Sequence, residues 1–188
     1  MLFRSDRLKK DFPIVIDEAM KVTSYGSLLK VCKDLLHEKI PIVDMLTIIE
    51  AVADIAEFTK APEILLEHVR AKLYRLITQK FKDTDGVLHI ITLKPELEQQ
   101  FIGKLQEHHG VSQLMLSIAE INNLVTKTKQ LLDKVEAKGF SKICMVVDPV
   151  LRKRMSEIYE KFGLHVSVLS HAELDSKANF SIEGTLEF

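Results

Sequence analysis

The chain has 188 residues, of which 46% are hydrophobic and 28% are charged, so it is expected to fold and has room for two small domains. Its 26 basic and 27 acidic side chains leave a net charge of −1, which disfavours nucleic acid and anionic membranes as partners. No apolar run reaches the roughly 18 residues that a transmembrane helix needs, so a soluble chain is expected.

The first part of the chain has the periodicity of amphipathic helices. Apolar residues recur at helical spacing over residues 28–36, 45–55 and 62–77. Asp44 precedes the second run, where its carboxylate is typical of an N-cap that accepts from the unpaired amides of the first turn. Residues 1–80 are therefore predicted to form an all-α helical subdomain.

The second part of the chain alternates between strand and helix patterns. Short β-branched apolar runs predict buried strands, and longer amphipathic runs between them predict helices. The strands are expected at 87–93, 143–147 and 166–169, and the helices at 96–106, 118–137 and 151–162. Residues 180–188 are extended and only partly alternating, which predicts an edge strand. Residues 81–188 are thus expected to form a small α/β subdomain with a short mixed sheet.

Residues capable of chemistry are present, but they match no catalytic or metal-binding motif. His108-His109 lacks further ligands at metal-binding spacing, and Ser170-His171 followed by Glu173 lacks the glycines of a nucleophile elbow. Cys32 and Cys144 match no metal-ligand or redox spacing, which favours a reducing compartment. We therefore expect no enzyme activity, no cofactor and no metal.

A basic cluster, Arg152-Lys153-Arg154, offers two interpretations. It is able to hold an acidic partner or a phosphate, or it belongs to a helix face in water between the apolar Leu151 and Met155. We favour the solvated face.

The run IPIVDMLTIIEA at residues 40–51, which continues to Ala53 and Asp54, resembles the signature helix of the FlhA/FHIPEP family of bacterial flagellar and type III export-gate proteins. The resemblance extends over nearly the whole chain. Its further segments are Leu66, Val69-Arg70, Ile77-Thr78, Ile91-Thr92-Leu93, Pro95 to Glu98, Leu151-Arg152, Val168 to Ser170 and Glu173-Leu174.

The resemblance implies a place for the chain within a longer protein. Residues 1–80 would correspond to the third, helical subdomain of the family's cytoplasmic region, and the remainder to the fourth, α/β subdomain. The family's membrane helices and first two cytoplasmic subdomains would lie outside this chain. The resemblance also implies a location on the cytoplasmic side of the bacterial inner membrane, with the membrane reached only through the other segments.

The resemblance further implies a docking function in protein export during flagellar assembly. Family members form a nine-membered ring and receive export chaperones with their cargo and the stalk protein of the export ATPase. The family's chaperone-binding depression lies between the first two subdomains, so strong chaperone binding by this chain alone is not expected. Four matched polar residues are candidate partner contacts, each with an alternative role as a helix cap or in an ion pair: Asp44, Arg70, Arg152 and Glu173.

Two other functions are weighed against docking. One is a small α/β enzyme with a helical accessory domain, which a polar pocket around Ser170 and His171 would favour. The other is a helix-turn-helix regulator that uses the first helices, which the near-zero net charge disfavours. The flagellar system is preferred over the injectisome on similarity.

Overall fold

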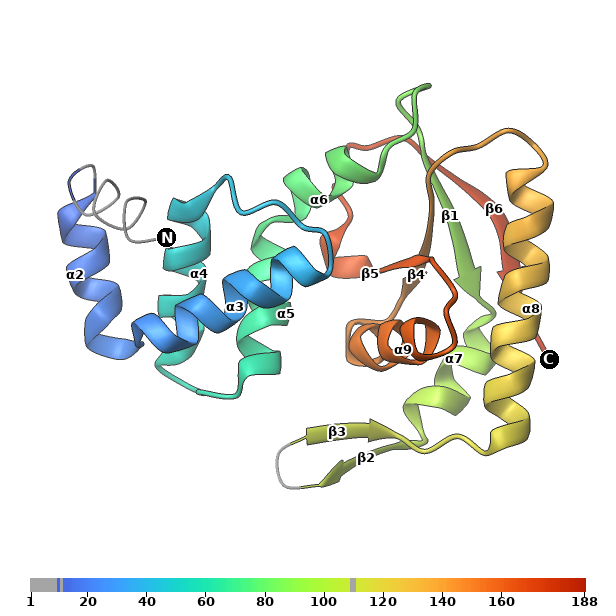
Figure 1. The fold of residues 1–188 in the computed structure, drawn as a ribbon, viewed down its shortest axis with the longest axis horizontal. Coiled ribbons are helices and arrows are strands. Elements are labelled where there is room, and N and C mark those ends of the chain that lie inside the picture. The colour runs from blue at the N-terminus through green and yellow to red at the C-terminus, as the bar shows by residue number, and fades with distance from the viewer. Residues whose placement is uncertain (1–9, 11, 109–110) are drawn as a thin grey trace. The chain divides into compact units, whose positions relative to one another are not determined.

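The computed structural model describes residue 10 and residues 12–108 and 111–188, and it divides into two compact units (Figure 1). A helical unit covers Met1–Tyr74 and an α/β unit covers Arg75–Phe188. The division falls after the first residue of helix α6 (Tyr74–Phe81), whereas the sequence periodicity predicts it near the end of this helix, between residues 80 and 81. The reason is that α6 has a helical apolar period of its own, which sequence alone cannot separate from that of the preceding helix.

In the helical unit, α4 (Met45–Ala56) packs against both α2 (Pro13–Val22) and α5 (Pro62–Lys72), and α5 packs against α3 (Tyr25–His37). The helices that the sequence predicts between residues 28 and 77 are confirmed, with the third run divided between α5 and α6. Helix α2 is an addition to the prediction. It buries Ile16 and Ala19 against Ile49 of α4 in a small apolar cluster of their own.

Local hydrogen bonds explain where these helices begin and end. The Ser24 hydroxyl accepts from the amide of Ser27 at 3.1 Å and so caps the start of α3. The same helix ends at His37 with Glu38 as its C-cap, and the next residue, Lys39, has a φ of 61° in the left-handed region. The amide of Ile40 then donates back to the carbonyl of Leu35 at 2.7 Å. This closing turn satisfies a carbonyl that would otherwise lack a partner.

In the α/β unit, the described residues form a four-stranded sheet in the order β5-β4-β1-β6, in which each neighbouring pair is parallel. After α6, the elements are β1 (Leu88–Leu93), α7 (Pro95–Ile102), β2 (Leu105–His108), β3 (Val111–Leu114), α8 (Ile118–Glu136), β4 (Ile143–Val147), α9 (Pro149–Lys161), β5 (Ser167–Ser170), η1 (His171–Glu173) and β6 (Phe180–Leu186). The predicted fold class, an all-α part followed by a small α/β part, is confirmed, and β6 is an edge strand as expected. The sheet itself was expected to be mixed, but its four strands are parallel because a helix or a longer connection separates each paired strand from the next.

Antiparallel pairing occurs outside the main sheet, in the hairpin of β2 and β3. The helix expected over residues 96–106 ends earlier, at Ile102, because Gly103 is its C-cap and the chain then enters β2. The hairpin was not predicted. His109 and Gly110, where the sequence indicates a polar break, lie outside the described residues.

Strands β1, β4 and β5 of the main sheet are buried on both faces, as strands of parallel sheets generally are, whereas Phe180 and Ile182 of β6 are exposed. One face contributes Ile91, Met145 and Val168 to a core that α7, α8 and α9 complete. Within this core, the hydroxyls of Thr128 on α8 and Tyr159 on α9 lie 3.0 Å apart and form a hydrogen bond. Residues that point to the other face are also buried: Leu88, Ile90, Cys144, Val146 and Leu169. None of the helices in the described part of the chain is long and apolar enough to span a membrane.

The edge strand β6 contains an irregularity where it passes α8 (Figure 1). Its register with β1 shifts between Ile90 and Ile91, so that Ile182 pairs with Ile90 and Gly184 pairs with Ile91. A side chain at Gly184 would meet Leu131 of α8, because a Cβ built there lies 2.5 Å from the Leu131 Cδ1 atom. Strand β6 therefore approaches α8 closely at a residue that has no side chain.

Candidate functional site

Asp44, the first candidate contact residue, caps helix α4. Its Oδ1 atom accepts from the amide of Thr47 at 3.1 Å, and its Oδ2 atom accepts from the Thr47 hydroxyl at 2.8 Å. The residue is exposed, so the cap does not remove it from the surface. The expected cap is confirmed.

Arg70, the second candidate, is buried on α5 and forms an ion pair with Glu38. Its side chain is 2% exposed, and its guanidinium donates to a carboxylate oxygen of Glu38, which is also largely buried. Glu38 follows α3, so this pair joins the end of one helix to the interior face of another. The intramolecular ion pair that the sequence left open as an alternative is confirmed.

Arg152 and Glu173, the remaining candidates, are buried together in the α/β unit. The Arg152 Nε atom lies 3.8 Å from Glu173 Oε1, and both side chains are 1% exposed. The Ser170 hydroxyl donates to the same carboxylate at 3.1 Å, and the Thr78 hydroxyl donates to the backbone carbonyl of Glu173 at 2.9 Å. The buried carboxylate thus has a guanidinium beside it and accepts from a hydroxyl, which compensates the burial of its charge.

The expectation that Arg152 faces water is wrong. Arg152 shares the buried face of α9 with Met155 and Tyr159, three and seven positions later, which is the spacing of one helix face. A partner that docks on the surface of this structure would therefore meet Asp44 before Arg70, Arg152 or Glu173. A contact role for these four residues stays a prediction.

The serine, histidine and acid at the end of β5 do not form a nucleophile with an adjacent base. Ser170 is buried and donates to Glu173, whereas His171 is exposed on the short helix η1. A nucleophile needs a base within hydrogen-bond reach and an open path to the substrate, and the burial of Ser170 removes that path. In the described ranges, no group of three His, Cys, Asp or Glu side chains is placed to hold a metal ion.

An open depression of about 640 Å³ lies at the carboxyl edge of the parallel sheet. Lys94 directly follows β1 and Glu187 directly follows β6, so the parallel strands bring both residues to this edge. The depression is lined by Lys94, Glu96, Leu97, Gln100, Lys127, Glu187 and Phe188. In open α/β sheets, ligands bind outside the carboxyl ends of the strands, which makes this depression the candidate docking site.

The candidate docking site carries both signs of charge beside an aromatic ring. Lys94 donates to the Glu187 carboxylate at 2.8 Å, and this hydrogen bond lowers the pKa of Glu187 and raises that of Lys94. Lys127 donates to the Glu187 carbonyl at 3.1 Å, and its ammonium lies 5.9 Å from the centre of the Phe188 ring. Such a surface suits a protein partner with charges of its own, because it offers charges of both signs beside an apolar ring.

Sequence reasoning missed this site because its residues are far apart along the chain. The signal that would have found it is a charged residue immediately after each of two strands, Lys94 after β1 and Glu187 after β6. That signal becomes useful only when the two strands are known to be neighbours, and their pairing is the non-local fact that sequence did not supply.

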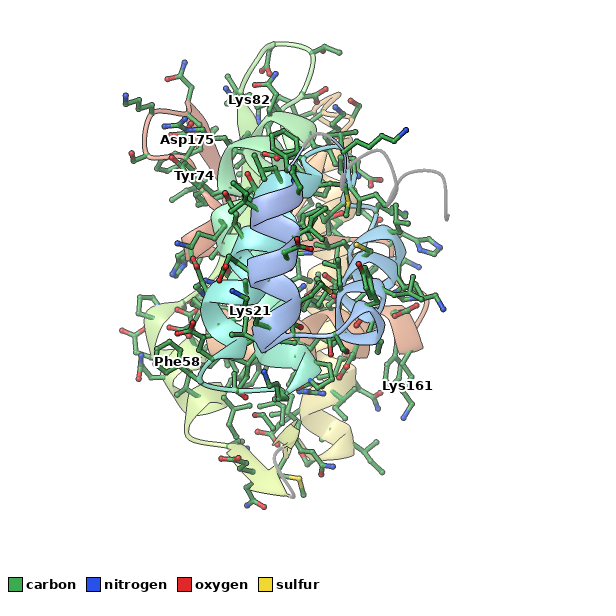
Figure 2. The ribbon with its side chains drawn as sticks, turned by 90° about the vertical axis from the view of Figure 1, so that its left-hand side faces the viewer. Lys21, Phe58, Tyr74, Lys82, Lys161 and Asp175 are labelled. Atoms are coloured by element: carbon green, nitrogen blue, oxygen red, sulfur yellow. The ribbon has the colours of Figure 1, made fainter. Side chains whose placement is uncertain are left out.

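The helical unit exposes two large apolar side chains close together in the sequence, Phe58 and Ile64. Phe58 lies in the turn after α4, and its side chain is 83% exposed, the largest exposed fraction of any bulky apolar side chain in the described residues (Figure 2). Ile64, in the first turn of α5, is half exposed. Exposed aromatic side chains are typical of contact points between proteins.

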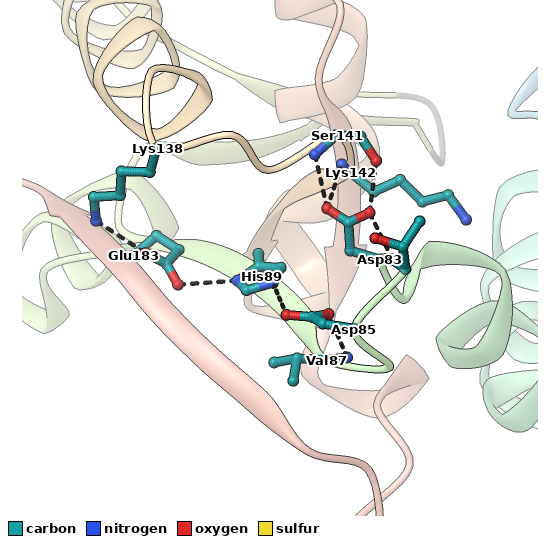
Figure 3. A network of polar contacts seen from close by, with 9 residues as sticks. Asp83, Asp85, Val87, His89, Lys138, Ser141, Lys142 and Glu183 are labelled. Carbon is teal, nitrogen blue, oxygen red and sulfur yellow. Dashed lines mark hydrogen bonds and ion pairs between the residues drawn. The ribbon is translucent and has the colours of Figure 1, made fainter.

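A network of charged groups joins three segments at the amino edge of the sheet (Figure 3). His89 of β1 lies between Asp85, at 3.0 Å from its Nε2 atom, and Glu183 of β6, at 2.9 Å from its Nδ1 atom. Glu183 also accepts from Lys138 at 2.9 Å. Hydrogen bonds from His89 and then Lys138 lower the pKa of Glu183 to about 2, so this carboxylate is ionised over the physiological range.

Solved structures with this fold come from type III secretion systems. Over 97% of its length, the chain matches Chlamydia pneumoniae CdsV with a TM-score of 0.87 and 21% identity, covering 52% of that chain. It matches the nonameric SctV-C of EPEC over 98% of its length with a TM-score of 0.86 and 18% identity, covering 55% of that chain. CdsV in a complex with CdsO matches over 97% with a TM-score of 0.84 and 21% identity, covering 53% of that chain. The fold is that of the C-terminal cytoplasmic regions of export-gate proteins.

Residues 4–179 match the FHIPEP family, and the chain belongs to this family. The flagellar biosynthesis protein FlhA of Helicobacter pylori is 41% identical over 182 residues, which are 96% of this chain and 25% of that protein. FlhA of Escherichia coli is 29% identical over 182 residues, again 96% of this chain and 25% of that protein. The chain thus spans about a quarter of the length of these relatives, and the expected family is confirmed. It is related to components of the flagellar and type III export apparatus, which is not a known family of enzymes.

Proposed function

We propose that this chain is a docking module of a flagellar export gate, on the cytoplasmic side of the bacterial inner membrane. There it receives export chaperones with their cargo and the stalk protein of the export ATPase. The observation that carries this proposal is the similarity to a flagellar biosynthesis protein at 41% identity over nearly the whole chain. A docking role without catalysis agrees with the burial of Ser170, the residue that would serve as nucleophile in the alternative enzyme function.

The candidate docking site is the surface that we assign to the stalk protein. It combines exposed charges of both signs with the Phe188 ring, a composition that gives a protein partner both orientation and an apolar contact. The solved complex of CdsV with CdsO supports docking of a second protein on this fold. Chaperones with their cargo are expected to need further segments of the longer protein besides this chain.

Ring assembly belongs to the same proposal. Nonameric assemblies of SctV-C and EscV share this fold, with TM-scores of 0.86 and 0.81, which supports a ring in which each copy contributes one docking site. Repeated copies of one site raise the local concentration of binding surfaces, so a weak individual contact is enough to hold a partner.

A binding assay with matched charge reversals tests the proposal. The 188-residue chain is immobilised, and the purified ATPase stalk protein and export chaperones from the same organism are passed over it. The site variant is Lys94→Glu with Lys127→Glu, and the control is Lys21→Glu with Lys161→Glu, which reverses two exposed lysines outside the site (Figure 2).

The stalk protein is expected to bind the wild type and the control variant, and to lose at least about tenfold in affinity for the site variant, since about 1.4 kcal/mol is enough for that loss. Failure of the stalk protein and of every chaperone to bind the wild type would refute docking by this chain. Equal binding to the two variants would retain docking but refute the assigned site.

A further inference from the structure

The ring of His89 has a carboxylate at each of its two nitrogens. Nδ1 lies 2.9 Å from Glu183 Oε1 and Nε2 lies 3.0 Å from Asp85 Oδ2, both within ordinary hydrogen-bond range. An ionised carboxylate only accepts hydrogen bonds, and a neutral imidazole carries a proton on one nitrogen alone. Both contacts are therefore hydrogen bonds only when His89 is the protonated imidazolium.

The two carboxylates differ in their surroundings. The Glu183 side chain is 8% exposed and has a second donor in Lys138, at the end of α8. The Asp85 side chain is 48% exposed and belongs to the β1 entry loop, the segment of residues 82–87 that leads from α6 into β1. Water is available to replace His89 at Asp85 but not at the buried Glu183.

Two further charged groups of this region, Asp83 in the β1 entry loop and Lys142 just before β4, bond to groups other than His89 (Figure 3). Asp83 of the β1 entry loop accepts from the amide of Ser141 at 2.7 Å and from its hydroxyl at 2.6 Å, and these bonds hold its pKa well below the usual range. Lys142 donates to the backbone carbonyls of Lys80 and Lys82 at 3.1 and 2.9 Å. The Asp83 carboxylate therefore keeps its charge throughout the pH range in which a histidine titrates. We call its pair of hydrogen bonds with Ser141 the Asp83 clasp.

We propose that His89 is a proton-controlled latch for the β1 entry loop. The protonated ring holds Asp85 and Glu183 together, and loss of one proton releases Asp85 while the contact with Glu183 remains. The proton that stays is the one on Nδ1, since the buried Glu183 requires a donor. Of the two attachments of the loop, Asp85 to His89 and Asp83 to Ser141, the deprotonated state keeps only the second.

The direction of the pKa shift agrees with this latch. Burial lowers the pKa of His89, but the hydrogen bonds to Glu183 and Asp85 outweigh burial and leave the pKa raised above its ordinary value of 6.5. A raised pKa means that the latch stabilises the fold fully below pH 6.5 and that this contribution is lost as the pH rises through the folded-state pKa. The stacking of Phe140 on the imidazole, with ring centroids 3.7 Å apart, holds the ring in place in either state.

The test is an NMR titration of the isotope-labelled 188-residue chain between pH 5 and pH 9, with His89→Gln to assign the His89 signals. His89 is expected to titrate above pH 6.5 and to be protonated on Nδ1 when neutral, whereas free histidine prefers the proton on Nε2. Amide exchange at Asp85, Gly86 and Val87, after correction for its intrinsic pH dependence, is expected to accelerate through the same midpoint.

Two conservative variants separate the latch from the neighbouring clasp. Asp85→Asn is expected to lower the His89 midpoint by roughly 1 pH unit, because it removes an adjacent negative charge. Asp83→Asn removes one of the two acceptor oxygens that Ser141 uses, does not contact His89, and is expected to leave the midpoint unchanged. A neutral ring protonated on Nε2, a midpoint at or below 6.5, or loop exchange that does not follow the His89 titration would overturn the proposal.

Discussion

The bulge in β6 provides a sharp test of how the edge strand packs on α8. In the change Gly184→Ala, the new Cβ atom would lie 2.5 Å from Leu131 Cδ1 and 3.2 Å from Leu131 Cγ and Cδ2. A contact under 3.0 Å requires a shift, so either the end of the Leu131 side chain must turn away or β6 must move. Leu131 packs at the margin of the α/β core and cannot turn away without losing apolar contacts there.

The size of the effect follows from two opposing contributions. Overpacking of a well-packed site costs about 1 to 3 kcal/mol. Replacing glycine by alanine at a compatible position returns about 0.4 to 1 kcal/mol by restricting the unfolded chain. Gly184→Ala is therefore expected to reduce the free energy of unfolding by about 1.3 kcal/mol, which is the difference between the midpoints of the overpacking cost and the entropic gain. In a Leu131→Ala background the clash is absent, and Gly184→Ala should instead stabilise by about 0.5 kcal/mol.

Tyrosine fluorescence isolates the α/β unit in this experiment. The chain has no tryptophan and three tyrosines, so Tyr25→Phe with Tyr74→Phe leaves the buried Tyr159 as the sole reporter of its own core. Urea unfolding of the wild type, both single variants and the double variant gives the coupling energy between Gly184 and Leu131. A coupling energy below about 0.5 kcal/mol would refute the reasoning, since that is the scatter expected for independent sites.

Other predictions concern caps and charges, and each is measured by chemical unfolding followed by circular dichroism. Asp44→Ala should cost about 1 kcal/mol by removing the cap of α4, whereas Asp44→Asn, which still caps, should cost a few tenths at most. Arg70→Met should cost about 3 kcal/mol because it leaves the Glu38 carboxylate buried without its ion pair; a loss under 1 kcal/mol would show that the pair is dispensable. Glu183 has a depressed pKa, so its contribution to stability is present above pH 4.5 and is lost as the pH falls toward 2; Glu183→Gln should remove this acid dependence.

Sequence reasoning succeeded where local pattern and final structure agree. The strand expected at residues 143–147 is β4 at the same residues, because an apolar β-branched run bounded by polar residues has few other choices. The helix expected at 118–137 is α8, whose start is fixed by a capping box between Ser117 and Glu120. Helix α4 likewise begins at its predicted cap, Asp44.

Sequence reasoning failed where contacts between residues distant in the sequence determine the secondary structure or the burial of a side chain. Helix α2 has no capping side chain, and its burial depends on Ile49 of α4. Strand β2 consists of Leu105 to His108, which contains no β-branched residue, so strand propensity does not predict it. The backbone hydrogen bonds with β3 stabilise it as a strand. The sequence placed Arg152 on a solvent-exposed helix face because two further basic residues follow it. Its partner Glu173 belongs to η1, so their pairing is not visible in the local sequence.

The strand order has a consequence for how the chain acquires its structure during synthesis. β1 is flanked by β4 and β6, and both of these neighbours follow it in the sequence. When the nascent chain has emerged from the ribosome as far as β1, this apolar strand has two unpaired edges. One of them stays unpaired until residues 180–186 have been synthesised. Long-range parallel pairing of this kind is slow and leaves strand edges open to aggregation. A chaperone that covers β1 until β6 has been synthesised would protect the open strand edges of the module from aggregation.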